Sequence, residues 1–468
     1  MTTLRTVAAL CLVAFAAAGC TDIKQVRTVD DLSVHDASHL APELACPQVG
    51  SPAAGEDLRM IENYGTHWLG YAEFSDEGWG YNASGQVHKI ETRLADSLQD
   101  EGANFVVIVF VHGWHHNAHD NDCNVNEFRV MLNVARDRYA PGGAYAKELG
   151  AKKVIGIYVG WRGESVDAAG LRYATVLDRQ GSAENVGRGA LRDLFAMLRK
   201  HELLANRRHA GRIQTMVMGH SFGGLIAYDA SSQAMVNELE LSRRDPGPQG
   251  CESGREKIAD TSKRAVPPWP DLTVLINPAF EAARFEPVYD VTHPANPCPY
   301  DPGLRPNLLV VTADNDIWTG EVYSAFRSMS TIFTGYDQGN AEAAKRESIA
   351  NKHAIGFVSR YRTHRLCLGT TPDSRVITVA AYTPQDETQP DQNRPVWVLG
   401  APPEIVDGHD GFLYGCDIKD SGKQTFLLNW LLDLQAYGPK QGTVTDDPGN
   451  CGAWPDGKSA SVVQCVGR

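Results

Sequence analysis

The chain has 468 residues, of which 43% are hydrophobic and 8% are aromatic, as expected for a soluble globular protein that buries a large core. Its length alone would allow up to about three domains. The formal net charge of −13 at pH 7 argues against nucleic acid or an anionic membrane surface as the main partner.

The first twenty residues form an apolar leader. An alanine-rich run over 7–19 follows Arg5, the only charge in this segment, and is too short to span a bilayer as a helix. The run ends in Ala-Ala-Gly directly before Cys20, which resembles a bacterial lipoprotein signal peptide whose cysteine is lipidated and becomes the first mature residue. An ordinary secretory signal cut near Ala18 is the alternative. Both predict a protein of the cell envelope, and the first predicts a lipid anchor that faces the periplasm or the exterior.

Cysteine usage agrees with a location outside the cytoplasm. Ten cysteines occur, and eight remain when Cys11 of the leader and Cys20 are set aside. An even number is expected where cysteines pair in an oxidising compartment, so disulfides are predicted. No C-x-x-C pair occurs, which argues against a zinc ribbon or thioredoxin-type chemistry.

After the leader, polarity separates a tether from a folded part. Residues 21–60 are polar, with scattered Asp and Pro, and are predicted to connect the anchor to the fold. From 61 to 437, strand-like and helix-like runs alternate. The run Phe105–Val111 is continuously apolar, which is typical of a strand covered on both faces in a parallel sheet. The alternation predicts one domain of the α/β class with a mostly parallel, doubly wound sheet.

Three stretches depart from this alternation. Residues 163–204 are long enough for a helical cap over a site, and 242–268 form a polar insertion with Pro and Gly. The tail over 438–468 is rich in Gly, Pro and Asp and is expected on the surface.

A G-x-S-x-G pattern places Ser221 between a strand-like run at 213–218 and a helix-like run. Glycines at 219 and 223 allow a sharp turn that exposes the serine hydroxyl at the carboxyl end of a sheet. The N-terminus of the following helix offers backbone N–H groups to a developing oxyanion. Ser221 is therefore predicted to be a nucleophile, and an ordinary turn with a serine N-cap is the alternative.

A serine nucleophile requires a histidine base and an acid that orients it, in the chain order Ser, acid, His. Asp316 follows the strand-like run at 307–312, where a loop leaving the sheet could turn a carboxylate inward; Asp314 is its competitor, and either could be a turn residue. His409 lies between glycines, before the last helix-like run, and is the predicted base. The competing histidines, His353 and His364, precede the last strands.

An oxyanion hole also needs a backbone donor from the loop after an earlier strand. The strand-like run that ends at Val111 leads into His112, Gly113 and Trp114. We predict the backbone N–H groups of Trp114 and Phe222 as the two donors, and His112 as a hydrogen-bonding brace of the loop.

Other polar and aromatic residues leave alternatives open. Trp161 and Arg162 could shape a substrate pocket, or they could pack under the cap and pair with an acid. Trp318 is expected in the core. The His- and Asp-rich loop at 115–123 could suggest a metal site, but it lacks ligand spacing such as H-E-x-x-H, so no metal is predicted.

Together these motifs resemble the α/β-hydrolase superfamily, and most of all its serine esterases and lipases. The turn at His112 and Gly113, the elbow at 219–224 and the late His409 carry the resemblance, which covers about 65–435. Little-characterised bacterial hydrolases share the His-Gly-Trp loop and the Gly-His-Ser-Phe-Gly-Gly elbow. The resemblance implies an α/β-hydrolase fold with a helical cap insertion and hydrolysis of esters through an acyl-serine intermediate, with Ser221, His409 and Asp316 as the triad.

The same resemblance implies a small-molecule or lipid ester as substrate and needs no cofactor, and the net charge already argues against a nucleic-acid partner. Two alternatives stay open at this point. The same triad could act as a thioesterase, amidase or peptidase, or the fold could be a catalytically silent binding module at the cell surface.

Overall fold

The computed structural model describes residues 24–35, 57–81, 85–99, 102–163, 176–207, 212–247, 250–253, 270–293, 298, 305–337, 339–370, 375–381, 395–413, 415–417, 422–438 and 444–445. The predicted signal peptide, most of the tail and Cys20 lie outside these residues.

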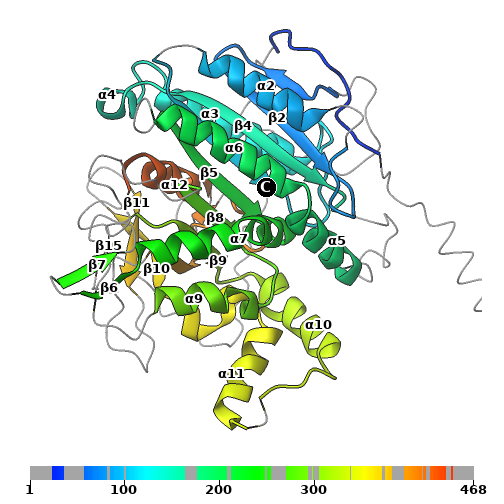
Figure 1. Ribbon diagram of the computed structural model, residues 1–468, viewed down its shortest axis with the longest axis vertical. Coiled ribbons are helices and arrows are strands. Elements are labelled where there is room, and N and C mark those ends of the chain that lie inside the picture. The colour runs from blue at the N-terminus through cyan, green and yellow to red at the C-terminus, as the bar shows by residue number, and fades with distance from the viewer. Residues whose placement is uncertain are drawn as a thin grey trace, which may run out of the picture.

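A large central sheet organises the described residues (Figure 1). Its 11 strands follow the order β1 (Ile61–Asn63), β2 (His67–Phe74), β4 (Lys153–Trp161), β3 (Phe105–Val111), β5 (Ile213–His220), β8 (Leu272–Ile276), β9 (Leu308–Ala313), β12 (Val396–Ala401), β10 (His364–Thr370), β11 (Arg375–Ala381) and β15 (Val444–Thr445). All neighbours from β2 to β10 are parallel, whereas β1 pairs with β2 and β11 with β10 in antiparallel register. The predicted α/β class and mostly parallel sheet are confirmed.

Helices cover both faces of this sheet, because the buried strands are apolar on both sides. Along β3, Val107 and Val109 belong to one buried cluster, whereas Val106 and Ile108 belong to the other, as strand alternation requires. The first cluster is completed by α2 (Gln86–Leu98), α5 (Val176–Arg188), α6 (Leu191–Asn206), α7 (Phe222–Ser242) and α9 (Glu286–Thr292). The second is completed mainly by α3 (Cys123–Tyr139) and α12 (Phe426–Tyr437).

Smaller elements lie around this core. They are α4 (Ala146–Leu149), the hairpins β6 (Arg244–Gly247) with β7 (Gly250–Ser253) and β13 (Gly415–Asp417) with β14 (Gly422–Gln424), and the helices α10 (Tyr323–Ser330) and α11 (Ala341–Lys352). The β6–β7 hairpin occupies the start of the predicted insertion, and a disulfide joins its Cys251 to Cys298. Cys123 and Cys367 are also disulfide-bonded. Among the described helices, none is both long and apolar enough to cross a membrane.

The range predicted as a cap, 163–204, has a different arrangement. Helix α6 packs with α2 and α7 in the layer over the sheet, because Leu191, Leu194 and Leu198 give it one buried apolar face. Within the described part of this range, which leaves out 164–175, the start of α5 approaches the candidate site through Val176 and Gln180. Helix α6 thus belongs to the helical layer over the sheet, and residues 164–175 of the predicted cap lie outside the described residues.

Part of the predicted tether is also folded onto the domain. Arg27 is completely buried; its guanidinium donates to Glu62 at 3.0 Å and to the backbone oxygen of Ala118 at 2.7 Å, and it lies over the ring of Tyr71. The backbone N–H of Arg27 donates to the Glu73 carboxylate at 2.8 Å. The polar composition of 21–60 predicted a tether exposed to water. Arg27 can nevertheless be buried, because the buried carboxylate of Glu62 compensates its charge.

Glu62 is the centre of this network. It also accepts from Arg129 at 3.0 Å and from the hydroxyl of Tyr71 at 2.7 Å. Burial alone would raise the pKa of Glu62, but the charges of Arg129 and Arg27 lower it well below its usual range. We call Arg27, Glu62, Tyr71 and Arg129 the N-terminal clamp, because they fasten residues 24–35 to the sheet.

Replacing Glu62 should therefore weaken the whole domain. Glu62→Gln removes the buried carboxylate that both guanidinium groups share and leaves the partly exposed Asp120 beside them, so we expect it to lower the free energy of unfolding by about 3–5 kcal/mol. Urea denaturation measures the change. Glu91→Gln, which removes a carboxylate paired with Lys200 on the surface, is the control and should cost at most about 1 kcal/mol. Equal effects of the two variants would contradict the role of the clamp.

Candidate active site

Ser221 lies at a strained turn between β5 and α7. Its φ of 55° is in the left-handed region that side chains rarely adopt. A Cβ atom at Gly219 would overlap the backbone of Gly223, and one at Gly223 would overlap the carbonyl oxygen of Val111. Because only glycine fits at both positions, the chain can turn sharply there. The turn leaves Ser221 at the carboxyl edge of the parallel strands.

Two long-range hydrogen bonds join Ser221 to a histidine and an aspartate. The Oγ atom of Ser221 lies 2.9 Å from His409 Nε2, and the Nδ1 atom of His409 lies 2.9 Å from Asp316 Oδ2. Asp316 follows β9 and is only 2% exposed. It also accepts from the backbone N–H of Trp318 at 3.0 Å, from that of Thr319 at 3.2 Å and from the Thr319 hydroxyl. The structure thus brings the three predicted residues into one hydrogen-bonded chain.

The electrostatics of this chain favour an ion pair when His409 takes up a proton. Burial alone would lower the pKa of His409, but the Asp316 carboxylate and its hydrogen bond outweigh burial and raise that pKa above its ordinary value of 6.5. Burial would likewise raise the pKa of Asp316, but His409 and the donors at Thr319 lower it. Asp316 therefore stays ionised and can stabilise a proton on His409.

The competing residues have other partners. Asp314 forms an ion pair with Arg365 at 2.6 Å. His353 contacts the hydroxyl of Ser324 at 3.0 Å, and His364 contacts that of Thr363 at 2.8 Å.

Sequence reasoning missed the groups that hold the His409 loop. Asn277, which follows β8 with a φ of 44°, donates through Nδ2 to the backbone oxygens of Gly408 at 2.9 Å and His409 at 2.8 Å. Its Oδ1 accepts from the backbone N–H of Ala313 at 2.8 Å. Asn315 Oδ1 accepts from the backbone N–H of Gly408 at 2.8 Å. An asparagine directly after a strand-like run was the available signal, because asparagine tolerates this left-handed backbone.

His220 supports the same loop from the elbow. Its Nε2 lies 2.8 Å from the backbone oxygen of His409, to which it donates, and its ring stacks on Phe412. Burial and the nearby His409 lower the pKa of His220 to about 4, so it is neutral at pH 7. The elbow and the base loop are therefore connected directly.

A mostly apolar cavity of about 170 Å³ opens at Ser221. It is lined by Trp114, His115, Val176, Gln180, Ser221, Phe222, Ala279, Trp318, Thr319, Val322, Tyr323, Phe326, Arg327, His409 and Asp410. Trp318 was expected in the core; instead it is half-buried, lines this cavity and meets Trp114 edge to face at 6.3 Å between ring centroids. The reason is that Asp316 turns the chain inward and so brings the next residues to the cavity wall.

Trp161 and Arg162 are absent from the described residues that line this cavity, which favours the alternative of packing and pairing with an acid over a pocket role. Trp161 is buried and donates through Nε1 to the backbone oxygen of His112 at 2.9 Å. His112 in turn accepts at Nε2 from the backbone N–H of Trp161 at 3.0 Å, in keeping with its predicted bracing role. Arg162 pairs with Asp76. Trp161 therefore braces the loop after β3, whereas Arg162 is paired with an acid of the loop after β2.

One group of described side chains could approach a metal ion. Ligand atoms of His220, His409 and Asp410 lie within 4.8 Å of one another. Both ring nitrogens of His409 are already hydrogen-bonded to Ser221 and Asp316, so metal binding would break that chain. In the His-rich loop, His116 instead pairs with Asp122 at 3.0 Å.

Comparisons with known proteins give weak similarities only. No protein-family model matches the chain, and no curated protein does. Phospholipase PlaB from Legionella pneumophila, in a structure with thio-NAD, is similar at 12% identity and a TM-score of 0.29, over 72% of this chain and 60% of that one. A second PlaB structure is similar at 14% identity and a TM-score of 0.29, over 73% of this chain and 61% of that one. An uncharacterized protein from Pseudomonas aeruginosa is similar at 10% identity and a TM-score of 0.26, over 80% of this chain and 53% of that one. The chain thus spans about 60% of the length of PlaB, and the site has to be interpreted from its own geometry.

The coupling between His409 and Asp316 can be measured directly. In the wild-type protein we expect the His409 imidazole to titrate above pH 6.5, because the Asp316 carboxylate stabilises its charged form. In Asp316→Asn the two largest influences that raise this pKa are lost and Asp410 alone still raises it, so the titration midpoint should fall well below that of the wild type. Histidine NMR signals, assigned by their loss in His409→Gln, give both values. An unchanged midpoint would show that the two side chains do not interact.

Proposed function

We propose that this protein is a serine hydrolase of the α/β-hydrolase type that cleaves carboxylic esters through an acyl-serine intermediate. The observation that carries the proposal is the hydrogen-bonded chain from Ser221 through His409 to Asp316 at the carboxyl edge of the sheet. A serine hydroxyl is a poor nucleophile by itself, and this arrangement supplies both a base and a group that orients it.

Each of the three side chains has a distinct role in the first half of the reaction. Ser221 Oγ attacks the ester carbonyl carbon while His409 Nε2 accepts its proton. Asp316 holds the Nδ1–H tautomer of His409 and stabilises the imidazolium that forms. His409 then donates the proton to the departing alcohol, which leaves the acyl group on Ser221.

The second half of the reaction returns the enzyme to its starting state. His409 removes a proton from a water molecule, whose oxygen attacks the acyl carbon, and the proton passes back to Ser221 as the carboxylic acid leaves. Every step uses side chains and backbone amides of this chain together with water.

Backbone amides next to the serine are suited to stabilise the oxyanion. Phe222 is the first residue of α7, so its N–H is among those a helix leaves without an intrahelical partner. Trp114 follows Gly113, where a Cβ atom would lie only 3.0 Å from Ser221 Cβ, so this loop passes directly beside the nucleophile. We assign the oxyanion hole to the N–H groups of Trp114 and Phe222.

The cavity favours an apolar acyl or alkyl group. Trp114, Val176, Trp318, Val322 and Phe326 contribute apolar side chains to its wall. A small-molecule or lipid ester fits this chemistry. The apolar leader and Cys20 support a location in the cell envelope, with a lipid anchor in the membrane.

Labelling of the nucleophile tests the proposal. A fluorophosphonate probe should attach to the wild-type protein and fail to attach to Ser221→Ala, and mass spectrometry should locate the adduct on Ser221. A panel of esters, thioesters and amides should show hydrolysis of esters by the wild type and a loss of about 10⁴-fold or more in kcat in the variant. An unlabelled but folded wild-type protein would favour a silent binding module. Preference for thioesters or amides would replace the ester assignment.

The loop that carries His409 should matter as much as His409 itself. Asn277→Gly keeps the left-handed backbone but removes three hydrogen bonds to the backbone at 313, 408 and 409. We expect kcat for a soluble ester to fall by up to about 10²-fold through misplacement of His409, with a smaller change in KM. Steady-state kinetics measures both values.

A matched substitution separates positioning from backbone strain. Asn277→Ala adds the cost of a left-handed alanine, so it should lower thermal stability further while its kcat stays near that of Asn277→Gly. If Asn277→Gly retained full kcat, the amide of Asn277 would not position the base.

A further inference from the structure

An apolar stripe runs from the candidate active-site cavity to the surface along α10. Val322, Phe326, Met329 and Phe333 follow one another at intervals of four, three and four residues, the spacing of one helix face as far as α10 extends. Val322 and Phe326 line the cavity. Met329 is 74% exposed and Phe333 is 96% exposed. The wall of the cavity thus continues into exposed apolar side chains.

Ile332, which is 73% exposed, adds to this surface. We call Met329, Ile332 and Phe333 the α10 surface. Three large apolar side chains exposed within five residues are costly in water, and such clusters commonly mark an interaction site. A fourth exposed side chain, Trp79, is 71% exposed in the loop after β2. Tryptophan is favoured at membrane–water interfaces because its ring is apolar and its N–H is polar.

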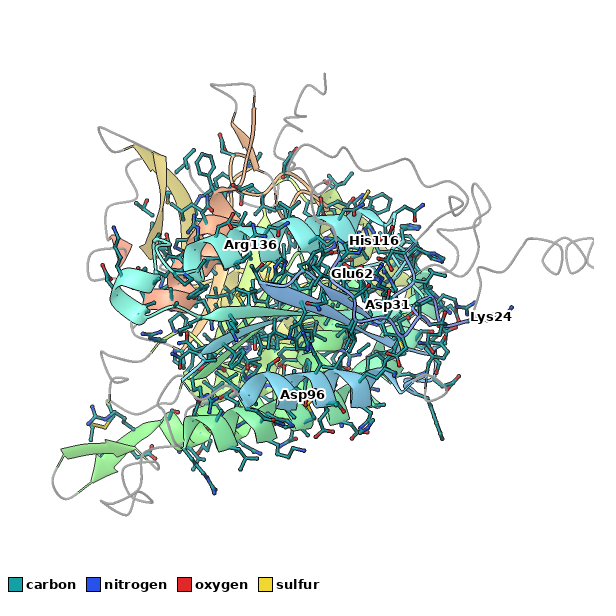
Figure 2. The ribbon with its side chains drawn as sticks, turned by 90° about the horizontal axis from the view of Figure 1, so that it is seen from above. Lys24, Asp31, Glu62, Asp96, His116 and Arg136 are labelled. Carbon is teal, nitrogen blue, oxygen red and sulfur yellow. A yellow bond between two sulfur atoms is a disulfide. The ribbon has the colours of Figure 1, made fainter. Side chains whose placement is uncertain are left out.

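The N-terminal clamp places the start of the folded chain at the same edge of the sheet. Arg27 contacts the loop after β3 through Ala118 and the end of β2 through Glu73. Parallel strands end at one edge, so these contacts lie on the side where Ser221 follows β5 and Ile317 follows β9. In Figure 1 the dark blue N-terminal segment lies at the upper right and α10 at the lower right, so the two are on the right-hand side but well apart along the long axis. In Figure 2, Lys24 lies on the side of His116 and away from Arg136.

The anchor has little freedom to choose another side. Only three residues separate Cys20 from Lys24, the first described residue. Four residue steps reach at most about 14 Å in a fully extended chain. If Cys20 carries a lipid, as the proposed function holds, the lipidated residue lies within that reach of Lys24, three residues before the buried Arg27.

We propose that the α10 surface docks on the phospholipid bilayer that holds the anchor, so that the cavity at Ser221 opens toward the membrane. This inference rests on the proposed lipid anchor at Cys20. The contact is apolar insertion, because a net charge of −13 opposes attraction to an anionic surface. It deepens the proposed function by naming the substrate source: acyl esters of membrane lipids, which enter the cavity along the apolar stripe of α10.

The orientation can be measured without relying on catalysis. The full lipidated chain is reconstituted into phosphatidylcholine vesicles that contain a nitroxide-labelled lipid. A bimane fluorophore is placed on Ile332→Cys or, as the control, on Leu204→Cys. Leu204 is also exposed, at 53%, but lies near the end of α6, which leads to the start of β5 at the opposite edge of the sheet. Wild-type protein treated with bimane gives the background from native thiols.

We expect quenching at position 332 to exceed that at position 204 by at least about threefold, since nitroxide lipid reaches only groups at the bilayer. Equal quenching at the two positions would overturn the proposal. A label at position 332 that is shielded in a cross-linked pair of chains, rather than quenched, would show that a second copy covers this surface and would also overturn it.

Activity gives the second readout. In Met329→Ser/Ile332→Ser/Phe333→Ser, hydrolysis of a lipid ester embedded in the vesicle should fall about tenfold or more, because three apolar side chains no longer enter the bilayer. Hydrolysis of a soluble short-chain ester should stay within about twofold of wild type. Leu204→Ser should change neither rate. Equal loss on both substrates would overturn the proposal.

These measurements separate the failure of this inference from that of the proposed function. If the wild-type protein hydrolyses no ester, the proposed function fails, and the quenching comparison alone decides the docking surface. If Cys20→Ser reconstitutes as fully as the wild type and its label at position 332 is not quenched, both the anchor and the docking surface fail.

Discussion

Ser221 is held in a left-handed backbone conformation that an isolated serine would seldom adopt, and the remainder of the site is arranged around that turn. The backbone N–H of Ser221 donates to the carbonyl oxygen of Ile276 on β8 at 3.0 Å, and the N–H of Ala279 donates to the Ser221 carbonyl at 3.1 Å. The turn is thus fixed by the strand next to β5 as well as by its own glycines. Such strain persists only where the surrounding structure over-determines it, and here it exposes the hydroxyl at the sheet edge.

The base reaches Ser221 from a loop almost two hundred residues later, so its position depends on contacts rather than on chain connectivity. Asn277, which directly follows Ile276, holds the backbone of the His409 loop, and His220, which directly precedes Ser221, holds the same loop through another hydrogen bond. Asn277 and His220, which lie next to the turn at Ser221, therefore also position the loop that carries His409. These contacts hold Ser221 Oγ and His409 Nε2 at a separation of 2.9 Å.

The sequence could predict what local pattern and chain order determine. Alternating apolar runs indicated the α/β class, and Ser221, Asp316 and His409 occur after or between the expected strands in the order that such a triad requires. Features that depend on packing between distant parts of the chain could not be predicted from the sequence. Trp161 is of a residue type that often lines pockets, yet its Nε1 donates to the backbone oxygen of His112. Trp318 lines the cavity instead, two residues after Asp316.

Arg27 shows the same limit from the opposite direction. A lone arginine in a polar stretch is expected to be exposed to solvent. Nothing in the neighbouring sequence indicates that Glu62, 35 residues further along the chain, is buried and pairs with it. The free energy of burying such a charge is favourable only when its partners are already in place, so the segment can dock only on a folded sheet.

This dependence has a functional side. The N-terminal clamp sits on β1, β2 and α3, whereas the strained elbow and the exposed apolar residues of α10 lie toward β5 and β9. Because the strands between them form one continuous parallel ladder, the sheet fixes the angle between the start of the folded chain and the mouth of the cavity. A flexible tether would let a membrane-bound enzyme sample every orientation, and most of them would turn its cavity away from the lipid. For the proposed lipid-anchored hydrolase, the N-terminal clamp would restrict that freedom by the same packing that makes the domain stable.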